Sequence, residues 1–480
     1  MKRDRGTSFN LRPLASPVVA FDARRFDDLV FAKMSETKIP SMSAAVVEDG
    51  RVVHARGFGW KDAAGATPAT PQTLYGIGSV TKSFVALAVG KLVESGKVSF
   101  HDPVTKFIPL KQRAFEGVEV HHLLSHTSGI PGLGSLEVIL FSAFREYHHW
   151  LPIASLDDMA SFLDGVDGWV VSRPGEKVHY LNEGFVLLGE IVSKASGRHW
   201  FDYLRSEILA PLEMKRTFLH KSDISADIDV ATPYAIRGAK MTPTPVPYGS
   251  DAAGGIMSCA ADLSNYVSML INGGEFRGKR VVSMDTLSKM EAPYAKWPIE
   301  NYGGDSYGYG FQVIPDFHGH KVVRHGGSLD VYTSDIEYVR DIGSGVVLLS
   351  NGTGYSMGLL GMSAVSLLLG VDPGELRAVK LEGLLKKLEG QYRTYKDTLV
   401  AEVKRVGSFL MLSGEDIGNN IILVPEGEEG DEARFFTLEG AARMEVVFKL
   451  DQHGVELFFE RYRYRRSGPV APRAETTWPS

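Results

Sequence analysis

The sequence predicts an α+β fold, with an antiparallel sheet flanked by helices, an all-helical lobe, and a separate C-terminal antiparallel β-barrel. Runs with strand character lie near both ends of the first ~370 residues, while helical periodicity fills the middle. Since neighbouring strands usually pair, we expect the two groups to complete one sheet. Beyond that point, short β-branched and aromatic runs alternate with turn signals, as in a barrel or sandwich.

The first part of the chain opens with a helix and a hairpin. Spaced apolar residues predict a helix over residues 22–38, and Asp49-Gly50 is the turn signal of a hairpin from Ser41 to Trp60. Further helices are expected over Ser79–Glu94, Leu136–Tyr147, Leu156–Leu163, Asn182–Ser196, Trp200–Leu209 and from Ala260 onward. Three strands and a last helix then follow at Lys321–Arg324, Asp335–Val339, Gly345–Leu349 and Met357–Leu369.

The last part of the chain is expected to be all-β. Its runs are Gln391–Thr394, Leu399–Val406, Ser408–Ser413, Ile421–Val424, Arg434–Leu438, Met444–Leu450 and Val455–Arg463. The change of pattern after Asp372-Pro-Gly374 predicts three segments. They are a first domain over residues 1–370, a linker over 371–388 and a β-barrel domain over 389–480.

Composition excludes several classes of protein. Of the 480 residues, 44% are apolar and 23% are charged, with a net charge of −6 and no basic block, which argues against a nucleic-acid partner. No apolar run is long enough to span a membrane, and Leu11 to Phe21 is too short and too proline-rich for a secretory signal. We therefore expect a cytoplasmic protein. The single cysteine, Cys259, allows no internal disulfide, and we interpret it as structural.

The most informative stretch is Tyr75-Gly-Ile-Gly-Ser-Val-Thr-Lys-Ser-Phe84. A glycine loop leads into a predicted helix, where Ser79 and Lys82 lie one turn apart on the same face. The unpaired N–H groups at a helix start favour negative charge, and a desolvated lysine can lose its proton near neutral pH. This S-x-x-K pattern therefore predicts a serine nucleophile with a lysine base.

Three other patterns are weighed against it. A second S-x-x-K, Ser35 to Lys38, lies where a helix is expected to end. A G-x-S-x-G match, Gly304 to Gly308, would make Ser306 the nucleophile of an α/β-hydrolase, but no apolar strand precedes it and no helix follows. The histidines His121, His122 and His126 invite a metal site, which we do not predict because no partner cluster with ligand spacing follows.

Two further motifs accompany Ser79 and Lys82. Tyr180-Leu-Asn182 is the only Tyr-x-Asn, and its phenol can relay a proton if a nearby lysine lowers the pKa of Tyr180. The amide of Asn182 can hold a substrate amide and orient Lys82, since it both donates and accepts. His325-Gly326-Gly327 ends a predicted strand, and its glycines let a substrate backbone approach closely, with the N–H of Ser328 beside it.

In this order, S-x-x-K, Y-x-N and H-x-G, the motifs resemble those of the serine β-lactamase-like superfamily. The branch is that of class C β-lactamases, D,D-peptidases and D-aminopeptidases, the S12 family. Leu123 to Gly129, Pro174 to Asn182, Gly184 to Gly189 and Ala253 to Met257 extend the resemblance over roughly residues 25–355. It implies an acyl-enzyme in which Ser79 attacks, Lys82 is the base and Tyr180 shuttles the proton. The N–H groups of Ser79 and Ser328 would form the oxyanion hole, while Asn182 and His325 would hold the substrate with Gly326 and Gly327.

The third motif departs from penicillin-binding members, which usually carry Lys-Thr-Gly to grip a carboxylate. His325 and Gly326 at this place argue against efficient β-lactam hydrolysis and resemble the D-aminopeptidases and esterases of the family. The β region around Gly390-Gln-Tyr392 resembles a lipocalin-like domain that some archaeal members use for assembly, which implies a homo-oligomer.

We therefore predict a serine hydrolase of D-aminopeptidase or D,D-carboxypeptidase type, acting on a small peptide, a D-amino-acid amide or an ester, without a cofactor or metal. Two alternatives stay open. One is a carboxylesterase of the same family with weak or no β-lactamase activity. The other is a catalytically silent binding or scaffold homologue, against which the intact Ser79, Lys82 and Tyr180 argue.

Overall fold

The protein divides into two compact units, Met1–Val371 and Asp372–Ser480. The structure is a computed structural model that describes residues 21–144, 153, 155–227, 229–237, 240–246, 251–414, 417 and 420–469. The N-terminal stretch that we tested for a secretory signal lies outside these residues, except for Phe21. Of the helix expected over Leu136–Tyr147, the structure describes residues 136–144 only. Each unit is described separately below.

Unit 1 is built on a nine-stranded sheet whose order is β10-β11-β12-β13-β14-β15-β1-β2-β3. The hairpin is formed by β1 (Ser41–Glu48) and β2 (Arg51–Asp62), as predicted. Strand β1 pairs antiparallel with β15 (Ser344–Ser350), with Ala45 opposite Val347. The prediction that strands from the two ends of this part complete one antiparallel sheet is therefore confirmed.

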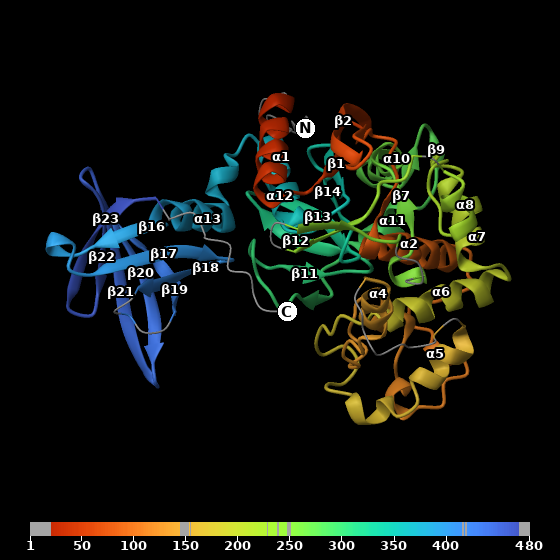
Figure 1. The fold of residues 1–480 in the computed structure, drawn as a ribbon. Coiled ribbons are helices and arrows are strands. Elements are labelled where there is room, and N and C mark those ends of the chain that lie inside the picture. The colour runs from red at the N-terminus through yellow and green to blue at the C-terminus, as the bar shows by residue number, and fades with distance from the viewer. Residues whose placement is uncertain are drawn as a thin grey trace, which may run out of the picture. The chain divides into compact units, whose positions relative to one another are not determined.

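The central strands are covered on both faces, because every residue of β14 (Thr333–Val339) and β15 is buried. On β14, Tyr338 contacts Glu291 at the end of helix α11 (Met284–Met290). Its neighbour Glu337 points to the opposite face, where Gly361 of α12 (Met357–Leu368) packs against its carboxylate. Helix α10 (Ala260–Ile271) covers β1 and β15 (Figure 1).

Several helices match the sequence-based ranges closely. They are α1 (Ala23–Thr37), α4 (Ser135–Phe144), α5 (Leu156–Phe162), α6 (Asn182–Ser196), α10 and α12. The helix expected over Ser79–Glu94 begins as a 3₁₀ turn, η1 (Gly78–Val80), and continues as α2 (Thr81–Glu94). The helix expected over Trp200–Leu209 is α7 (Trp200–Leu204) followed by a π turn over Arg205–Leu209.

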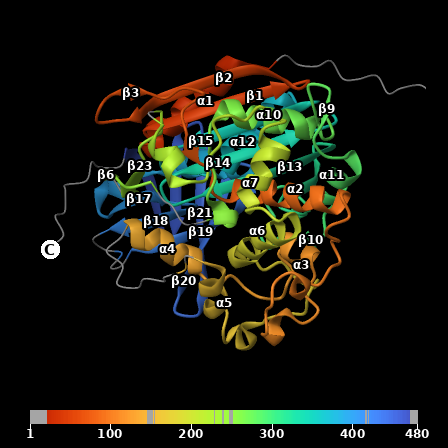
Figure 2. The ribbon, with the colours of Figure 1, turned by 90° about the vertical axis from the view of Figure 1, so that its right-hand side faces the viewer.

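The remaining short helices are α3 (Val120–Leu124), α8 (Lys221–Ser225), α9 (Asp251–Gly254) and the 3₁₀ turns η2 (Val104–Lys106), η3 (Arg113–Phe115) and η4 (Val166–Trp169). Figure 2 shows α3, α4, α5 and α6 gathered below the sheet, as the helical part of unit 1. Helix α6 of this part packs on α2, and so does the short helix α9. The turn η1, which contains Ser79 and leads into α2, contacts β13 and β14 of the sheet as well as α9.

The sequence did not predict the strands at the β10 edge of the sheet. These are β10 (Ala295–Lys296), β11 (Ser306–Tyr307) and β12 (Gln312–Phe317), which lead to β13 (His320–Ser328). Two-residue strands give no alternation pattern, and β12 contains Pro315. The other short pairs are β2 with β3 (Thr67–Pro68), β4 (Tyr75–Gly76) with β7 (Met257–Ser258), β5 (Tyr234–Arg237) with β6 (Lys240–Pro243) and β8 (Glu275–Phe276) with β9 (Lys279–Arg280).

Unit 2 is a closed antiparallel barrel of eight strands, with β16 paired to β23. The strands are β16 (Gly390–Arg393), β17 (Val400–Val406), β18 (Phe409–Gly414), β19 (Ile421–Glu429), β20 (Glu432–Glu439), β21 (Ala442–Asp451), β22 (Gly454–Phe459) and β23 (Tyr462–Gly468). The run expected over Val455–Arg463 is two strands, because the chain turns at Glu460 with a positive φ of 50°. The 3₁₀ turns are η6 (Pro373–Glu375) and η7 (Tyr395–Asp397).

The interior of the barrel is filled by alternate residues of its strands, including Val403, Leu412 and Phe448. The segment over which we expected a linker contains helix α13 (Arg377–Leu388). Two residues of this helix, Leu385 and Leu388, belong to the same apolar cluster as the barrel interior. Within the described parts of the chain, no helix has the length and hydropathy that crossing a bilayer requires.

The end of β13 packs directly on the loop that leads to Ser79. A Cβ on Gly327 would lie 2.0 Å from the carbonyl oxygen of Ile77, and one on Gly78 would lie 2.7 Å from the nitrogen of Ser328. Ser334 of β14 also donates to the Ile77 carbonyl, at 2.7 Å. The absence of side chains at 78 and 327 therefore brings two distant segments into backbone contact.

This contact predicts different outcomes for two adjacent glycines. Gly327→Ala should lower the free energy of unfolding by about 2–3 kcal/mol, because its methyl group would overlap backbone. Gly326→Ala is the matched control and should cost less than about 1 kcal/mol, since its nearest atom is a side-chain oxygen of Asp335 at 3.2 Å. Denaturant unfolding of both variants measures the difference, and equal losses would contradict the packing described.

Candidate active site

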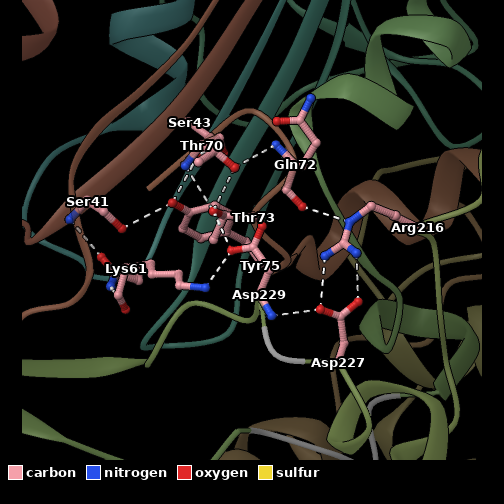
Figure 3. A network of polar contacts seen from close by, with 11 residues as sticks. Ser41, Ser43, Lys61, Thr70, Gln72, Thr73, Tyr75, Arg216, Asp227 and Asp229 are labelled. Carbon is pink, nitrogen blue, oxygen red and sulfur yellow. Dashed lines mark hydrogen bonds and ion pairs between the residues drawn. The ribbon is translucent and has the colours of Figure 1, made fainter. Parts of the chain in front are cut away.

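A polar network holds the stretch that precedes Ser79 (Figure 3). The phenol oxygen of Tyr75 lies 3.1 Å from the hydroxyls of both Ser41 and Ser43 on β1. Asp229 accepts from Lys61 at 2.7 Å and from Thr73 at 2.9 Å. The start of the nucleophile loop is thus fixed to the sheet before the chain reaches Gly76.

Arg216 and Asp227 extend this network. The Arg216 side chain donates to the carbonyl of Gln72 at 2.9 Å and pairs with Asp227, which also accepts from the backbone N–H of Asp229 at 2.7 Å. Gly78 then adopts a left-handed φ of 49°, which favours glycine, and the 3₁₀ turn presents Ser79 half-buried.

Lys82 is fully buried, with 0% of its surface exposed. Its Nζ lies 3.1 Å from Ser79 Oγ, and it donates to Asn182 Oδ1 at 2.8 Å and to the Ala253 carbonyl at 2.6 Å. Burial lowers the pKa of Lys82 to about 7, although the carboxylates of Glu137 and Glu183 oppose this shift. The residue predicted as the base is therefore desolvated and adjacent to the serine.

The contacts of Lys82 also determine where the protons and the lone pair of its neutral form point. A neutral amine has two protons and one lone pair. The Asn182 amide oxygen and the Ala253 carbonyl can only accept, so they take both protons. The lone pair is then left for the hydroxyl of Ser79, which is the geometry of a general base.

Tyr180 is hydrogen-bonded to Ser79, so the three side chains expected to converge do so. Its ring also lies under Lys82, with Nζ 4.9 Å from the ring centroid. Burial raises the pKa of Tyr180 well above its usual range, which outweighs the opposing effect of the Ser79 bond. The expectation that a nearby lysine lowers this pKa was wrong, because desolvation dominates, and Tyr180 is a neutral phenol.

Asn182 links Lys82 to an acidic residue. While its oxygen accepts from Lys82, its Nδ2 donates to Glu137 Oε1 at 3.2 Å. Glu183, the next residue, is buried and accepts from the N–H and the hydroxyl of Ser135 at 3.1 and 2.5 Å. Helix α4 therefore starts against α6, and Glu137 in its first turn faces Asn182.

His325 lies at the site but does not present a free cation. Only 2% of the residue is exposed. Its Nδ1 lies 2.7 Å from the Gly326 carbonyl, so this nitrogen carries the proton, and Nε2 accepts from the Tyr307 hydroxyl at 2.8 Å. Burial and the nearby Lys82 lower the pKa of His325 to about 3, which keeps the ring neutral at physiological pH.

A cavity of about 680 Å³ opens beside these residues. Its lining includes every predicted site residue except Lys82, namely Ser79, Tyr180, Asn182, His325, Gly326, Gly327 and Ser328. This volume lies within the usual range for a small-molecule site. Its wall also contains Trp297, whose ring stacks on Tyr307 at 5.5 Å between centroids and meets the edge of Tyr180 at 6.1 Å.

His126, which the sequence suggested only as a candidate metal ligand, supports the segment that bears Tyr180. Its Nδ1 accepts from the N–H of Leu181 at 3.0 Å, and its carbonyl accepts from the N–H of His179 at 2.7 Å. The ring lies 4.1 Å from that of Tyr180. His126 has a left-handed φ of 58°, and burial lowers its pKa well below the usual value. His126 therefore accepts hydrogen bonds from the residues on either side of Tyr180, His179 and Leu181.

His121, His122 and His126, whose spacing suggested a metal site in the sequence, do not form a three-residue ligand group with one another among the residues that the structure describes. In the described part of the chain, the one group with ligand-like spacing is His101, Glu119 and His121, whose ligand atoms lie within 4.8 Å of one another. The nearest pair is His101 Nδ1 and Glu119 Oε2 at 2.8 Å. None of the three is among the residues lining the cavity at Ser79.

The competing serine motifs lack the required surroundings. Ser306 lies on the short antiparallel strand β11, donates to the Gly304 carbonyl at 2.8 Å and precedes no helix, so it forms no nucleophile elbow. Ser35 and Lys38 are exposed at the end of α1. Cys259 is fully buried directly before α10, and burial raises its pKa to about 12, which fits a structural residue.

Comparison with known proteins agrees with this geometry. Residues 26–363 match the family model for Beta-lactamase. The chain belongs to the beta-lactamase family. Residues 373–465 match a second model, the Pab87 octamerisation domain. The resemblance noted in the sequence is therefore confirmed for both parts of the chain.

Among solved structures, the chain is similar to the octameric penicillin-binding protein homologue from Pyrococcus abyssi. The two are 41% identical, with a TM-score of 0.87 over 92% of this chain and 99% of that one. A hydrolase with promiscuous acyltransferase activity, EstCE1, matches at 20% identity and a TM-score of 0.60, over 72% of this chain and 98% of its own. At that identity it shows the shared fold.

Two curated relatives match over 68% of this chain. Protein flp of Staphylococcus aureus (strain MW2) is 25% identical over 342 residues, and Penicillin-binding protein 4* of Bacillus subtilis (strain 168) is 26% identical over 346 residues. The matches span 63% and 72% of those proteins, respectively. The chain thus spans less than two thirds of Protein flp.

Proposed function

We propose that this member of the beta-lactamase family is a serine hydrolase that cleaves amide or ester bonds through an acyl-enzyme. The observation that supports this most directly is the buried Lys82 amine, 3.1 Å from Ser79 Oγ with two carbonyl-type acceptors for its protons. A desolvated lysine beside a serine hydroxyl, with its pKa lowered to about 7 by burial, is typical of catalytic sites and favours this proposal over a catalytically silent scaffold.

In the proposed acylation, Ser79 Oγ attacks the substrate carbonyl and its proton passes to Lys82 Nζ. The N–H groups of Ser79 and Ser328 stabilise the resulting oxyanion, a contribution of roughly 3–4 kcal/mol per donor. Gly78 supports this role for Ser328, because its missing side chain lets the Ser328 nitrogen approach the nucleophile loop. The departing amine or alcohol then takes a proton.

Tyr180 is the proposed relay for that proton. As a neutral phenol bonded to Ser79, it can give its proton to the leaving group and recover one from Lys82, which lies over its ring. Asn182 orients Lys82, and His126 holds the segment of Tyr180. Water then attacks the acyl-enzyme and releases the acid, with the same groups acting in reverse.

We propose a peptidase of the D-aminopeptidase or D,D-carboxypeptidase type, with carboxylesterase activity as the alternative. Two relatives are named as penicillin-binding proteins or homologues. In this chain the neutral, buried His325 replaces the cation that would grip the carboxylate of a penicillin. We therefore propose that β-lactams are poor substrates here.

Removal of either member of the nucleophile pair tests the proposal. Ser79→Ala and Lys82→Ala should each reduce hydrolysis of p-nitrophenyl acetate by at least about 10³-fold, because the two act as one unit. Ser306→Ala is the matched control and should retain activity. A fluorophosphonate probe with peptide mapping should label Ser79, and labelling of Ser306 or retained activity in Ser79→Ala would contradict the assignment.

We also propose that unit 2 assembles the chain into a homo-oligomer, since it matches an octamerisation domain and a 41% identical relative is octameric. Light scattering coupled to gel filtration should give a mass several times the 52.6 kDa of one chain, with eight copies the expected number. A concentration-independent mass of one chain would exclude it.

A further inference from the structure

The charged side chains that line the cavity at Ser79 are mostly acidic. Of the described lining residues, Glu137, Asp330 and Asp335 are acids, Arg324 is the one positively charged side chain, and His325 is neutral. Arg324 is already paired, with Asp335 at 2.5 Å and with the buried Glu337 at 3.0 Å. A substrate carboxylate would therefore meet surplus negative charge, whereas a substrate ammonium would be attracted.

Glu137 is the acid best placed to receive such an ammonium. It is exposed to the cavity, and the contact described above ties only one of its oxygens to Asn182 Nδ2. A single amide group separates this carboxylate from Lys82 Nζ, which itself contacts Ser79. These contacts link Glu137 to Ser79 in a continuous series, and both residues line the cavity that an acyl group attached to Ser79 would occupy.

The position of Glu137 is fixed from two directions. Ser135, two residues earlier, donates twice to Glu183 on α6, and Asn182 of α6 donates to Glu137 itself. A glutamate that only stabilised the start of α4 would not require the hydrogen bond from Asn182. Preorganised in this way, the carboxylate loses little freedom when it binds a ligand.

From these contacts we propose that Glu137 binds the protonated N-terminal amine of the substrate, so that the site takes aminoacyl or short peptidyl groups with a free amino terminus. This rests on the proposed serine hydrolase function and selects the aminopeptidase type from the types considered there. Asn182 would then orient the Glu137 carboxylate, in addition to orienting Lys82 and holding the substrate.

The test compares D-alanine p-nitroanilide with N-acetyl-D-alanine p-nitroanilide, and the corresponding L-compounds, near pH 7. Wild type should show a kcat/KM at least about tenfold higher for the free amine of the preferred enantiomer, as expected for a charge-assisted contact. The advantage should fall as the pH rises past ~8, where an α-amino group loses its proton.

In Glu137→Gln the ratio of the two kcat/KM values should fall about tenfold or more, and Glu137→Asp should retain part of the preference. Glu116→Gln, a matched change at an exposed glutamate of the same unit, should leave the ratio as in wild type. An equal loss on both substrates in Glu137→Gln would make Glu137 only a positioning residue for Asn182 and would overturn the proposal.

A binding measurement separates this inference from the proposed function. Ser79→Ala, which cannot form the acyl-enzyme, should bind D- or L-alaninamide more tightly than the N-acetyl compound, and Ser79→Ala/Glu137→Gln should lose this difference. If wild type hydrolyses no ester or anilide but the binding difference persists, the hydrolase proposal fails and the inference stands. Hydrolysis without any preference for the free amine would overturn the inference alone.

Discussion

The arrangement of the site depends on the desolvation of one ammonium group. Lys82 is enclosed between the nucleophile turn, α6 and α9, so that charging it would cost more than charging a lysine in water. Two acceptors hold the protons of the neutral amine and leave its lone pair toward Ser79. Glu137 and Glu183 offset part of the shift and so keep the pKa near neutrality. A general base is most effective when its pKa lies close to the working pH.

The other features of unit 1 serve to hold this amine and its serine in place. Backbone contact at Gly78 and Gly327 joins β13 to the nucleophile loop, while Tyr75 and Asp229 fix the loop from the other side. His126 clamps the segment of Tyr180 between α3 and α6. Among the described residues that line the cavity, Arg324 is the one cation, and it is paired with Asp335. The proposed preference for a cationic substrate group rests on this distribution of charge.

The parts of the fold and site that depend on neighbouring residues in the chain could be predicted from the sequence. The turn and helix around Ser79, the hairpin from Ser41 and the alternating strands of the barrel follow from periodicity and turn residues. His126 and Glu137 could not be found in this way, because their partners, Leu181 and Asn182, lie 55 and 45 residues away. The raised pKa of Tyr180 also depends on burial, which no motif encodes. Strands β10 and β11 are too short to give a pattern.

The pH dependence of kcat/KM for p-nitrophenyl acetate tests the central claim most directly, because this parameter reports the ionisation of the free enzyme. Burial lowers the pKa of Lys82 to about 7, so the basic form accumulates as the pH rises through that value. The rate constant should increase with pH and reach half of its plateau near pH 7. A flat profile between about pH 5 and 9, or a midpoint near that of a solvated lysine at ~10.4, would contradict the account.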